Sequence, residues 1–227
     1  MPKTISAKKN SATSRYSILL VDDHPLFRKG MTQLLDSQDD LRVTQEADSS
    51  GAALTAIRTG RFDLAVVDIG LGGGANGIEL TKSLKAERPD IPVLVVSMHD
   101  EALYAERALR AGARGYVMKR EALDSILLAV RSVIGGEIYI SPSMTKRMLF
   151  DHIQGGGGRD AVDRLTDREL EVFQLIGEGH DMHQIASQLH LSKKTVEAHR
   201  ANIKEKLGIG SAREVVRYAT QWVAQER

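Results

Sequence analysis

The sequence predicts a doubly wound α/β domain with a five-stranded parallel sheet, followed by a small all-α domain. Three observations lead to this prediction. Five short apolar runs alternate with amphipathic stretches up to about residue 135, four consecutive glycines follow at 155–158, and the pattern beyond Leu165 is purely helical. Strands that alternate with helices are typical of a parallel sheet covered on both faces.

The expected strands are apolar almost throughout, as a sheet buried on both faces requires. They are Ile18–Val21, Arg42–Ala47, Leu64–Asp68, Val93–Ser97 and Gly115–Met118. The helices expected between and after them are Leu26–Ser37, Ser49–Thr59, Ile78–Arg88, Glu101–Ala111 and Glu121–Ile134.

The second half of the chain divides into a linker and a helical domain. A helix is expected near Ser143–Ile153, and the glycines after it are typical of a flexible joint. Thr166 and Glu169 have the spacing of a capping box, with Leu165 and Leu170 as its hydrophobic staple. The expected organisation is a disordered basic tail (1–16), an α/β domain (17–135), a linker (136–158) and a helical domain (159–224).

The composition excludes several classes of protein. Apolar residues make up 42% and charged residues 27%, as in ordinary globular proteins, and cysteine is absent, which rules out disulfides and thiolate chemistry. No apolar run approaches the roughly 18 residues of a membrane helix, and no apolar segment follows the basic N-terminus as in a secretory signal. We expect a cytoplasmic protein without membrane contact.

The net charge of +1 conceals local excesses. Residues 1–17 carry four basic groups and no acid, and Lys193 to Arg217 contains seven basic groups against three acidic ones. The second excess is a candidate surface for a polyanion, although such runs are also found on ordinary solvated faces. For the N-terminal tail, a disordered extension is favoured over a second surface of this kind.

Polar residues end four of the predicted strands. The first strand is followed by Asp22 and Asp23, and Asp68, Ser97 and Lys119 stand at the ends of the third, fourth and fifth. Ligands of open parallel sheets lie beyond this edge. Three adjacent carboxylates repel one another unless a cation lies between them, and oxygen ligands favour Mg²⁺. One carboxylate could then act as a nucleophile toward a phosphoryl group. Asp68 is the best candidate, with Lys119 and Ser97 binding phosphoryl oxygens.

Residues 17–135 resemble the receiver domain of bacterial two-component response regulators. The resemblance is carried by VDDHPLFRKG (21–30), AVVDIGL (65–71), VVSMHD (95–100) and GYVMK (115–119). It implies a flavodoxin-like strand order of 2-1-3-4-5 and Asp68 as the phospho-acceptor. It also implies that Mg²⁺ is held by Asp22, Asp23, Asp68 and the Gly70 carbonyl. Ser97 and Tyr116 resemble the switch pair, in which the ring moves inward. On position alone, an ordinary half-buried strand aromatic is the favoured interpretation of Tyr116.

The loop after Asp68 departs from this family. It reads GLGGGANG at 70–77, whereas receivers usually have a proline there and one residue fewer. Because glycine loosens a loop, we expect an altered acyl-phosphate lifetime rather than loss of the chemistry.

Residues 182–201 have the pattern of a helix-turn-helix, with helices near Met182–Leu189 and from the N-cap Ser192 to about Leu207. Val196, Ile203 and Leu207 form an apolar stripe, opposite a face with small alanines that suits close approach to a major groove. The string LTDRELEVFQLI…IASQLHLSKKTVEAHRANIKEKLGI resembles the LuxR-type DNA-binding domain, so the whole chain is similar to NarL/FixJ-family regulators. The expected DNA-contacting residues are Lys193, Lys194, Thr195, Glu197, Ala198, Ala201 and Lys204.

Several residues of this domain have competing interpretations. Glu197 could accept from cytosine N4 or repel phosphates at wrong sites, and Arg200 more plausibly pairs with an acid such as Glu169 than with a base. A metal site is disfavoured for the histidines His180, His183, His190 and His199. The last helix, Ala212–Ala224, has Val215, Val216, Ala219 and Trp222 or Val223 on its apolar side; it either forms a dimer contact or packs only within its domain.

The resemblance implies a response regulator whose phosphorylation by a sensor histidine kinase controls binding to promoter DNA, as a homodimer when phosphorylated. It would not be an enzyme beyond its own phosphoryl transfer and dephosphorylation. The alternative is a phosphorylation-controlled protein-interaction module without DNA binding, and the basic excess at Lys193 to Arg217 argues against it.

Overall fold

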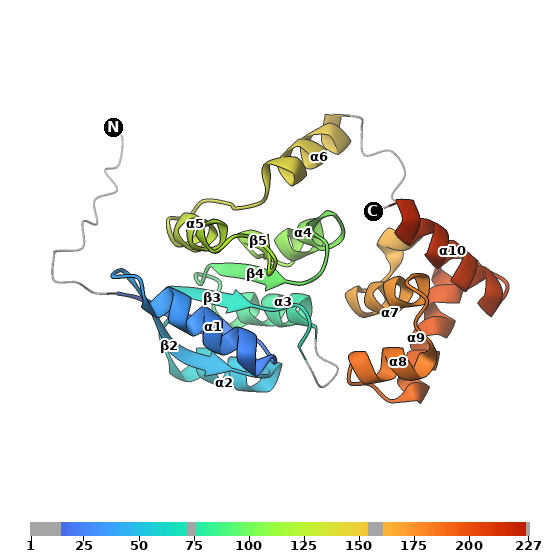
Figure 1. Ribbon diagram of the computed structural model, residues 1–227, viewed down its shortest axis with the longest axis horizontal. Coiled ribbons are helices and arrows are strands. Elements are labelled where there is room, and N and C mark those ends of the chain that lie inside the picture. The colour runs from blue at the N-terminus through green and yellow to red at the C-terminus, as the bar shows by residue number, and fades with distance from the viewer. Residues whose placement is uncertain (1–14, 72–75, 154–160, 226–227) are drawn as a thin grey trace.

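The first domain contains the predicted parallel sheet. The computed structural model describes residues 15–71, 76–153 and 161–225. Its strands are β1 (Tyr16–Val21), β2 (Leu41–Ala47), β3 (Leu64–Val67), β4 (Val93–Ser97) and β5 (Gly115–Met118). They pair in parallel in the order β2-β1-β3-β4-β5, which confirms the expected topology (Figure 1). The expected strand boundaries differ from the observed ones by no more than two residues at either end.

Helices cover both faces of this sheet. Their bounds are α1 (Pro25–Asp36), α2 (Ser50–Thr59), α3 (Gly77–Glu87), α4 (Glu101–Arg110) and α5 (Leu123–Ile134). One buried cluster joins α1 and α5 to the sheet through Leu35 and Val130, and the other joins α2, α3 and α4 through Ile57 and Leu84. The chain order reverses beside β1, so the carboxyl ends of β1 and β3 form the edge where ligands of such sheets bind.

The linker and the tail lie partly outside the described residues. Helix α6 (Pro142–Ile153) is the expected linker helix and is labelled apart from the sheet in Figure 1. The predicted glycine joint at 155–158 falls in the undescribed range, as do residues 1–14 of the predicted tail. The predicted boundary after residue 16 was wrong by one position, because Tyr16 is the first residue of β1 and its amide donates to the Asp40 carbonyl at 2.7 Å.

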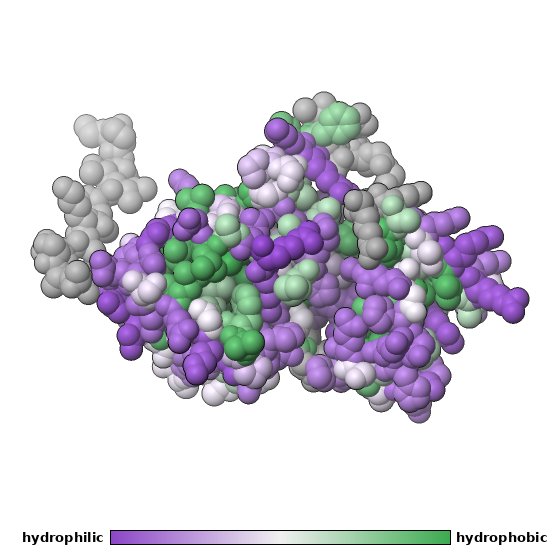
Figure 2. All heavy atoms as spheres, in the orientation of Figure 1, coloured by the Kyte–Doolittle hydropathy of each residue, from purple (hydrophilic) through white to green (hydrophobic). Residues whose placement is uncertain are grey.

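The second domain is helical, as expected. It consists of a short 3₁₀ turn η1 (Ala161–Arg164), α7 (Asp167–Gly177), α8 (Met182–Gln188), α9 (Lys193–Lys206) and α10 (Ala212–Gln225). The capping box of α7 is confirmed, with Thr166 accepting from the Glu169 amide and Glu169 accepting from the Thr166 amide. Hydrophilic side chains cover most of this domain on the face shown in Figure 2.

Helix α10 uses most of its apolar residues inside its own domain. Val215, Ala219 and Trp222 are buried, and the Trp222 ring lies 5.5 Å from that of Phe173 on α7. Val216, in contrast, is 46% exposed. The expected apolar side therefore divides: three of its residues build the domain core, and Val216 is left on the outside.

Candidate functional site

A buried ion-pair cluster lies where β1, β3 and β5 end. The Lys119 Nζ lies 2.6 Å from Oδ2 of Asp22 and 2.7 Å from Oδ2 of Asp68, and all three side chains are at most 4% exposed. The Asp68 amide donates to the Val21 carbonyl at 2.9 Å, which holds the acceptor strand beside β1. The structure thus brings together the aspartates and the lysine that the sequence placed at separate strand ends.

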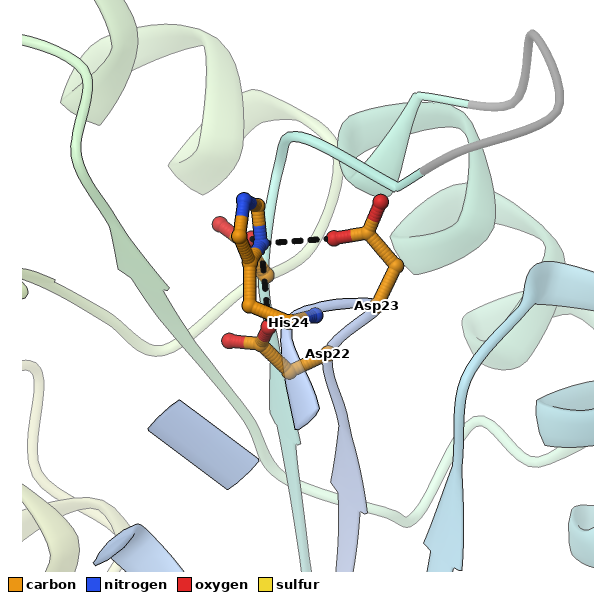
Figure 3. A group of neighbouring side chains, drawn as sticks. Asp22, Asp23 and His24 are labelled. Atoms are coloured by element: carbon orange, nitrogen blue, oxygen red, sulfur yellow. Dashed lines mark hydrogen bonds and ion pairs between the residues drawn. The ribbon is translucent and has the colours of Figure 1, made fainter. Parts of the chain in front are cut away.

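Four side chains of this edge form a group with the spacing of metal ligands. One ligand atom each of Asp22, Asp23, His24 and Asp68 lies within 4.8 Å of the others. Figure 3 shows dashed lines from the His24 ring to the carboxylates of both neighbouring aspartates, and Nδ1 lies 2.7 Å from Oδ1 of Asp23 and 3.4 Å from Oδ1 of Asp22. His24 was missed as a site residue, although it directly follows the two aspartates in the sequence.

The electrostatics of the cluster favour an added cation. Burial raises the pKa of the Asp68 carboxyl, Lys119 opposes this shift, and the charge of Asp22 adds to it. Three carboxylates against one ammonium leave the cluster short of positive charge. Carboxylate oxygens are preferred ligands of Mg²⁺, so the donor set fits this ion.

Lys119 is held in place by packing as well as by charge. Its Nζ lies 4.3 Å from the ring centroid of Phe27 on α1, within the range of a cation–π contact. Its amide donates to the Ser97 carbonyl at 2.8 Å, which aligns the ends of β4 and β5. Phe27 was missed by sequence reasoning, because an aromatic residue on an amphipathic helix is usually only part of the core.

Ser97 and Tyr116 lie close to the cluster and are fully buried. The Ser97 hydroxyl accepts from the His99 amide at 3.2 Å, and the Tyr116 hydroxyl donates to the His99 carbonyl at 2.8 Å. Burial raises the pKa of Tyr116 and lowers that of His99 to about 4, where the charges of Lys119 and Arg168 add to the shift. The Tyr116 ring is therefore already inward in this state, rather than half-buried.

The loop that follows Asp68 is described at its two ends. Gly70 lines the same cavity as Asp68, and its backbone opposes the rise in the pKa of the Asp68 carboxyl. Residues 72–75, the glycine-rich centre of the predicted departure, lie outside the described residues. Gly77 has no room for a side chain, because a Cβ there would lie 1.9 Å from the Asp68 carbonyl oxygen.

The second domain covers one side of this edge. A cavity of about 360 Å³ is lined by Asp68 and Ser97 from the first domain and by Glu171 and His190 from the second. Glu171 is 1% exposed and accepts from Asn76 Nδ2 at 2.5 Å. Burial raises the pKa of Glu171 to about 7, against the opposing effect of its partner Arg168. Nothing in the sequence pattern indicated this contact.

Helix α9 presents the expected DNA-contacting face to solvent. Val196 and Ile203 are buried beneath it and Leu207 is half-buried, as the apolar stripe predicted. The helix starts at the predicted N-cap, since Ser192 accepts from the Thr195 amide at 3.0 Å. The exposed residues of the expected contact set are Lys193, Lys194, Glu197, Ala198, Ala201 and Lys204, and Thr195 is half-buried.

Glu169 has a different partner from the one suggested for it. Its carboxylate lies 2.6 Å from Lys206 Nζ and also caps α7, so the suggested pair with Arg200 was wrong for this acid. The metal-ligand group found among the described residues contains none of the four histidines of the second domain.

Together, the fold and the site define a protein with two functional parts. The α/β domain has buried aspartates at the carboxyl edge of its sheet, and a buried lysine forms ion pairs with two of them. The helix-turn-helix domain exposes a basic helix. None of the helices in the described ranges has the length and hydropathy needed to cross a membrane.

Comparison with protein families gives the same division. Residues 18–131 match the family described as "Response regulator receiver domain", and residues 163–219 match "Bacterial regulatory proteins, luxR family". Both ranges fall inside the two domains that the structure shows.

Curated relatives match nearly the whole chain. The oxygen regulatory protein NreC of Staphylococcus carnosus is 33% identical over 207 residues, which cover 89% of this chain and 95% of that protein. The fimbriae Z protein of Salmonella typhimurium is 36% identical over 203 residues, with the same coverage of both chains.

Solved structures share the fold. A LuxR-family two-component response regulator from Aurantimonas is 30% identical, with a TM-score of 0.58, and the match covers 62% of this chain and 99% of that one. RcsB of Salmonella enterica, bound to the promoter rprA in the presence of phosphomimetic BeF₃⁻, is 24% identical with a TM-score of 0.60; the match covers 91% and 99% of the two chains. The latter likeness shows the fold alone.

The chain belongs to the NarL/FixJ family of two-component response regulators, with a receiver domain followed by a LuxR-type DNA-binding domain. It is a DNA-binding transcription regulator, and the family match decides against the alternative of a protein-interaction module without DNA binding. Proteins of this class are generally not catalytic enzymes.

Proposed function

We propose that Asp68 is the phospho-acceptor and that its phosphorylation by a sensor histidine kinase controls promoter binding. The convergence of Asp22, Asp68 and Lys119 within 2.7 Å at the carboxyl edge of the sheet carries this proposal. A carboxylate oxygen of Asp68 forms a bond to phosphorus, the phosphorus–nitrogen bond of a phosphohistidine breaks, and the imidazole leaves with its electron pair and gains a proton. The product is an acyl phosphate.

A magnesium ion would be held by Asp22, Asp23, Asp68 and the Gly70 carbonyl, with His24 beside them. When bound, Mg²⁺ neutralises the charge that gathers on the transferred phosphoryl oxygens. Lys119 would exchange its ion pair with Asp68 for one with a phosphoryl oxygen. The Ser97 hydroxyl would donate to another, giving up its bond from the His99 amide.

The switch pair is proposed with a modified role for Tyr116. Its ring is buried and its hydroxyl is bonded to the His99 carbonyl before phosphorylation. We therefore expect Ser97 to be the moving member, and the ring of Tyr116 to keep its inward position. His99, between them in sequence, would transmit the change through its backbone.

The second domain would bind promoter DNA through the exposed face of α9. Lys193, Lys194 and Lys204 would bind phosphates and position the helix, and Ala198 and Ala201 allow close approach to the bases. Glu197 and Thr195 complete the proposed contact set. The protein would act in the cytoplasm, where promoter DNA is found.

A homodimer would bind two half-sites about one turn of DNA apart. Solved structures of the relative RcsB include dimers bound to DNA. Val215, Ala219 and Trp222 are buried in the core of their own domain. A dimer contact through α10 would therefore have to use exposed residues such as Val216.

The acceptor can be identified chemically. The full chain is incubated with Mg²⁺ and phosphoramidate, and the acyl phosphate is reduced with borohydride, which converts the modified aspartate to homoserine. Peptide mass spectrometry should place the conversion at residue 68 and find none in Asp68→Asn. Conversion at Asp22 or Asp23 in the wild type would contradict the assignment.

A further inference from the structure

The two domains are joined by an arginine that bonds to three groups. Arg107 on α4 donates through Nη1 to the Leu165 carbonyl at 2.8 Å and to Asp167 Oδ1 at 3.1 Å, and through Nη2 to the Val162 carbonyl at 3.2 Å. Lys82 on α3 adds a longer ion pair of 3.5 Å to Asp167. One side of the DNA-binding domain is thereby held against the receiver.

A second contact connects this interface to the acceptor. Asn76, bonded to Glu171, immediately precedes Gly77, whose amide donates to the Ile69 carbonyl at 2.8 Å. Gly77 packs so closely on the Asp68 backbone that a Cβ would not fit. Asn76 is thus connected to the acceptor by tightly packed backbone. We call Asn76, Arg107, Asp167 and Glu171 the latch.

The latch leaves the DNA-reading face uncovered. The residues of the second domain that line the cavity over Asp68 come from α7, α8 and the turn after α8, including Glu171, Gln174 and His190. Among the described residues that line this cavity, none belongs to α9. Lys194, Ala198 and Ala201, on α9, are exposed while the latch is closed.

We propose that the latch restrains where the DNA-binding domain can reach, and that it does not mask the face that reads DNA. The resting chain then binds a short duplex as a monomer, and phosphorylation adds pairing on longer sites. This inference rests on the proposed functions of Asp68 and α9, and it makes the DNA-reading face available in both states.

The charges in the cavity give phosphorylation a means of opening the latch. A phosphoryl group carries about 1.5 to 2 negative charges at neutral pH and replaces the charge of the Asp68 carboxylate, so the site gains about one negative charge. It would share the cavity with Glu171 and Glu178, and with Arg168, whose guanidinium is already paired with Glu171. Like charges in a partly enclosed site repel. Phosphorylation therefore disfavours the closed latch. By the same coupling free energy, the closed latch disfavours phosphorylation of Asp68.

The test uses a latch variant and a control with the same charge change. Arg107→Glu places a carboxylate against Asp167. Arg110→Glu makes the same change on the same helix at an exposed residue that, among the residues the structure describes, pairs with Glu106 alone. Because the chain has no cysteine, Lys29→Cys and Gln221→Cys can be spin-labelled in each background. Pulsed dipolar spectroscopy should show one narrow distance in the wild type and Arg110→Glu, and a broad distribution in Arg107→Glu. The double variant Arg107→Glu, Asp167→Arg restores an ion pair but not the two bonds to the Leu165 and Val162 carbonyls, so it should narrow the distribution only in part.

DNA binding is then measured by fluorescence anisotropy with two probes. The first is a non-specific duplex of about 12 bp, roughly one turn. The second is a duplex of about 30 bp, long enough for two half-sites one turn apart, selected from random sequence by the chain carrying beryllofluoride. Unphosphorylated wild type, Arg110→Glu and Arg107→Glu should bind the short duplex within about twofold of one another, whereas Arg107→Glu should bind the long duplex about tenfold more tightly. Lys194→Glu should weaken both.

Each outcome separates this inference from the proposed function. Wild type that fails to bind the short duplex, while Arg107→Glu binds it, would show a masked face and overturn the inference but keep the DNA-binding role of α9. An unchanged spin-label distance in Arg107→Glu would overturn the latch. Short-duplex binding that Lys194→Glu leaves untouched would instead contradict the proposed role of α9.

Discussion

The ammonium of Lys119 lies 2.7 Å from the carboxylate of Asp68, and both side chains are nearly inaccessible to water. Asp22 shares the same ammonium at 2.6 Å, so a single positive charge serves two buried carboxylates, with Asp23 beside them. The excess of carboxylates over ammonium groups makes the cluster electrostatically unfavourable without a further cation.

Asp68→Asn should stabilise the chain when divalent ions are absent. The substitution removes one of the buried like charges and leaves Asp22 paired with Lys119, so we expect the free energy of unfolding in EDTA to rise by about 1–2 kcal/mol. Mg²⁺ should stabilise the wild type more than the variant. Urea denaturation with and without Mg²⁺ measures both effects; a less stable variant in EDTA would contradict the account of the cluster.

Gly77→Ala should be strongly destabilising, because its Cβ would overlap the backbone of Asp68. We expect a loss of about 2–3 kcal/mol or more, and slower phosphorylation by phosphoramidate. Gly51→Ala is the matched control, since nothing lies within 4 Å of its added Cβ in α2 and the alanine should stabilise that helix by about 0.5–1 kcal/mol. Equal effects at the two glycines would show that the close approach at Gly77 is unimportant.

Glu171→Gln should change the pH dependence of stability in a defined window. The pKa of Glu171 is about 7 in the folded chain and near 4.5 when the carboxyl is exposed, so folding binds a proton between these values. The stabilising effect of that proton is fully present below about pH 4.5 and is lost as the pH rises through 7.

The measurement is the difference in urea midpoint between wild type and Glu171→Gln at several pH values. Taking the difference cancels the contribution of His99, whose pKa of about 4 in the folded chain lies below its usual value and acts in the opposite direction. Wild type should lose stability relative to the variant from about pH 4.5 to 7 and not above. A constant difference would mean that Glu171 does not take up this proton.

Shortening the loop after Asp68 should lengthen the life of the acyl phosphate. Replacing 71–75 with a segment one residue shorter that contains proline, while Gly70, Asn76 and Gly77 are kept, should hold the backbone beside the acceptor more firmly and limit the approach of water. We expect the dephosphorylation rate to fall several-fold, measured by phosphate release after removal of phosphoramidate. Unchanged kinetics would mean that the glycine-rich loop has no part in setting the lifetime.

The sequence was sufficient for the sheet because its signals are local. Five apolar runs with turn residues between them determine which segments form strands, and polar residues at the strand ends converge once the strands are parallel. This is why Asp22, Asp68 and Lys119 could be predicted as neighbours from positions far apart in the chain. The capping box at Thr166 was predictable for the same reason, since its donors and acceptors lie within four residues.

The contacts between the two domains could not be predicted in this way. Arg107 shares an amphipathic helix with one other arginine, and no periodic pattern separates it from Arg110, whose ion pair among the described residues is with Glu106 of the same helix. Glu171 is a charged residue in a helix that otherwise has a regular apolar face, yet it is buried because Asn76 and Arg168 bond to it. Such pairs depend on the relative placement of two domains, about which neither sequence segment carries local information.

Footprinting of the genome with wild type and Asp68→Asn tests the central claim most directly. Cells are compared with both proteins at equal abundance, under conditions in which phosphorylated protein is detected in the wild type. The account predicts protected promoter sites that contain two half-sites in the wild type and that are lost or much weakened in Asp68→Asn. The same set of sites, occupied equally by both proteins, would contradict control of DNA binding through Asp68.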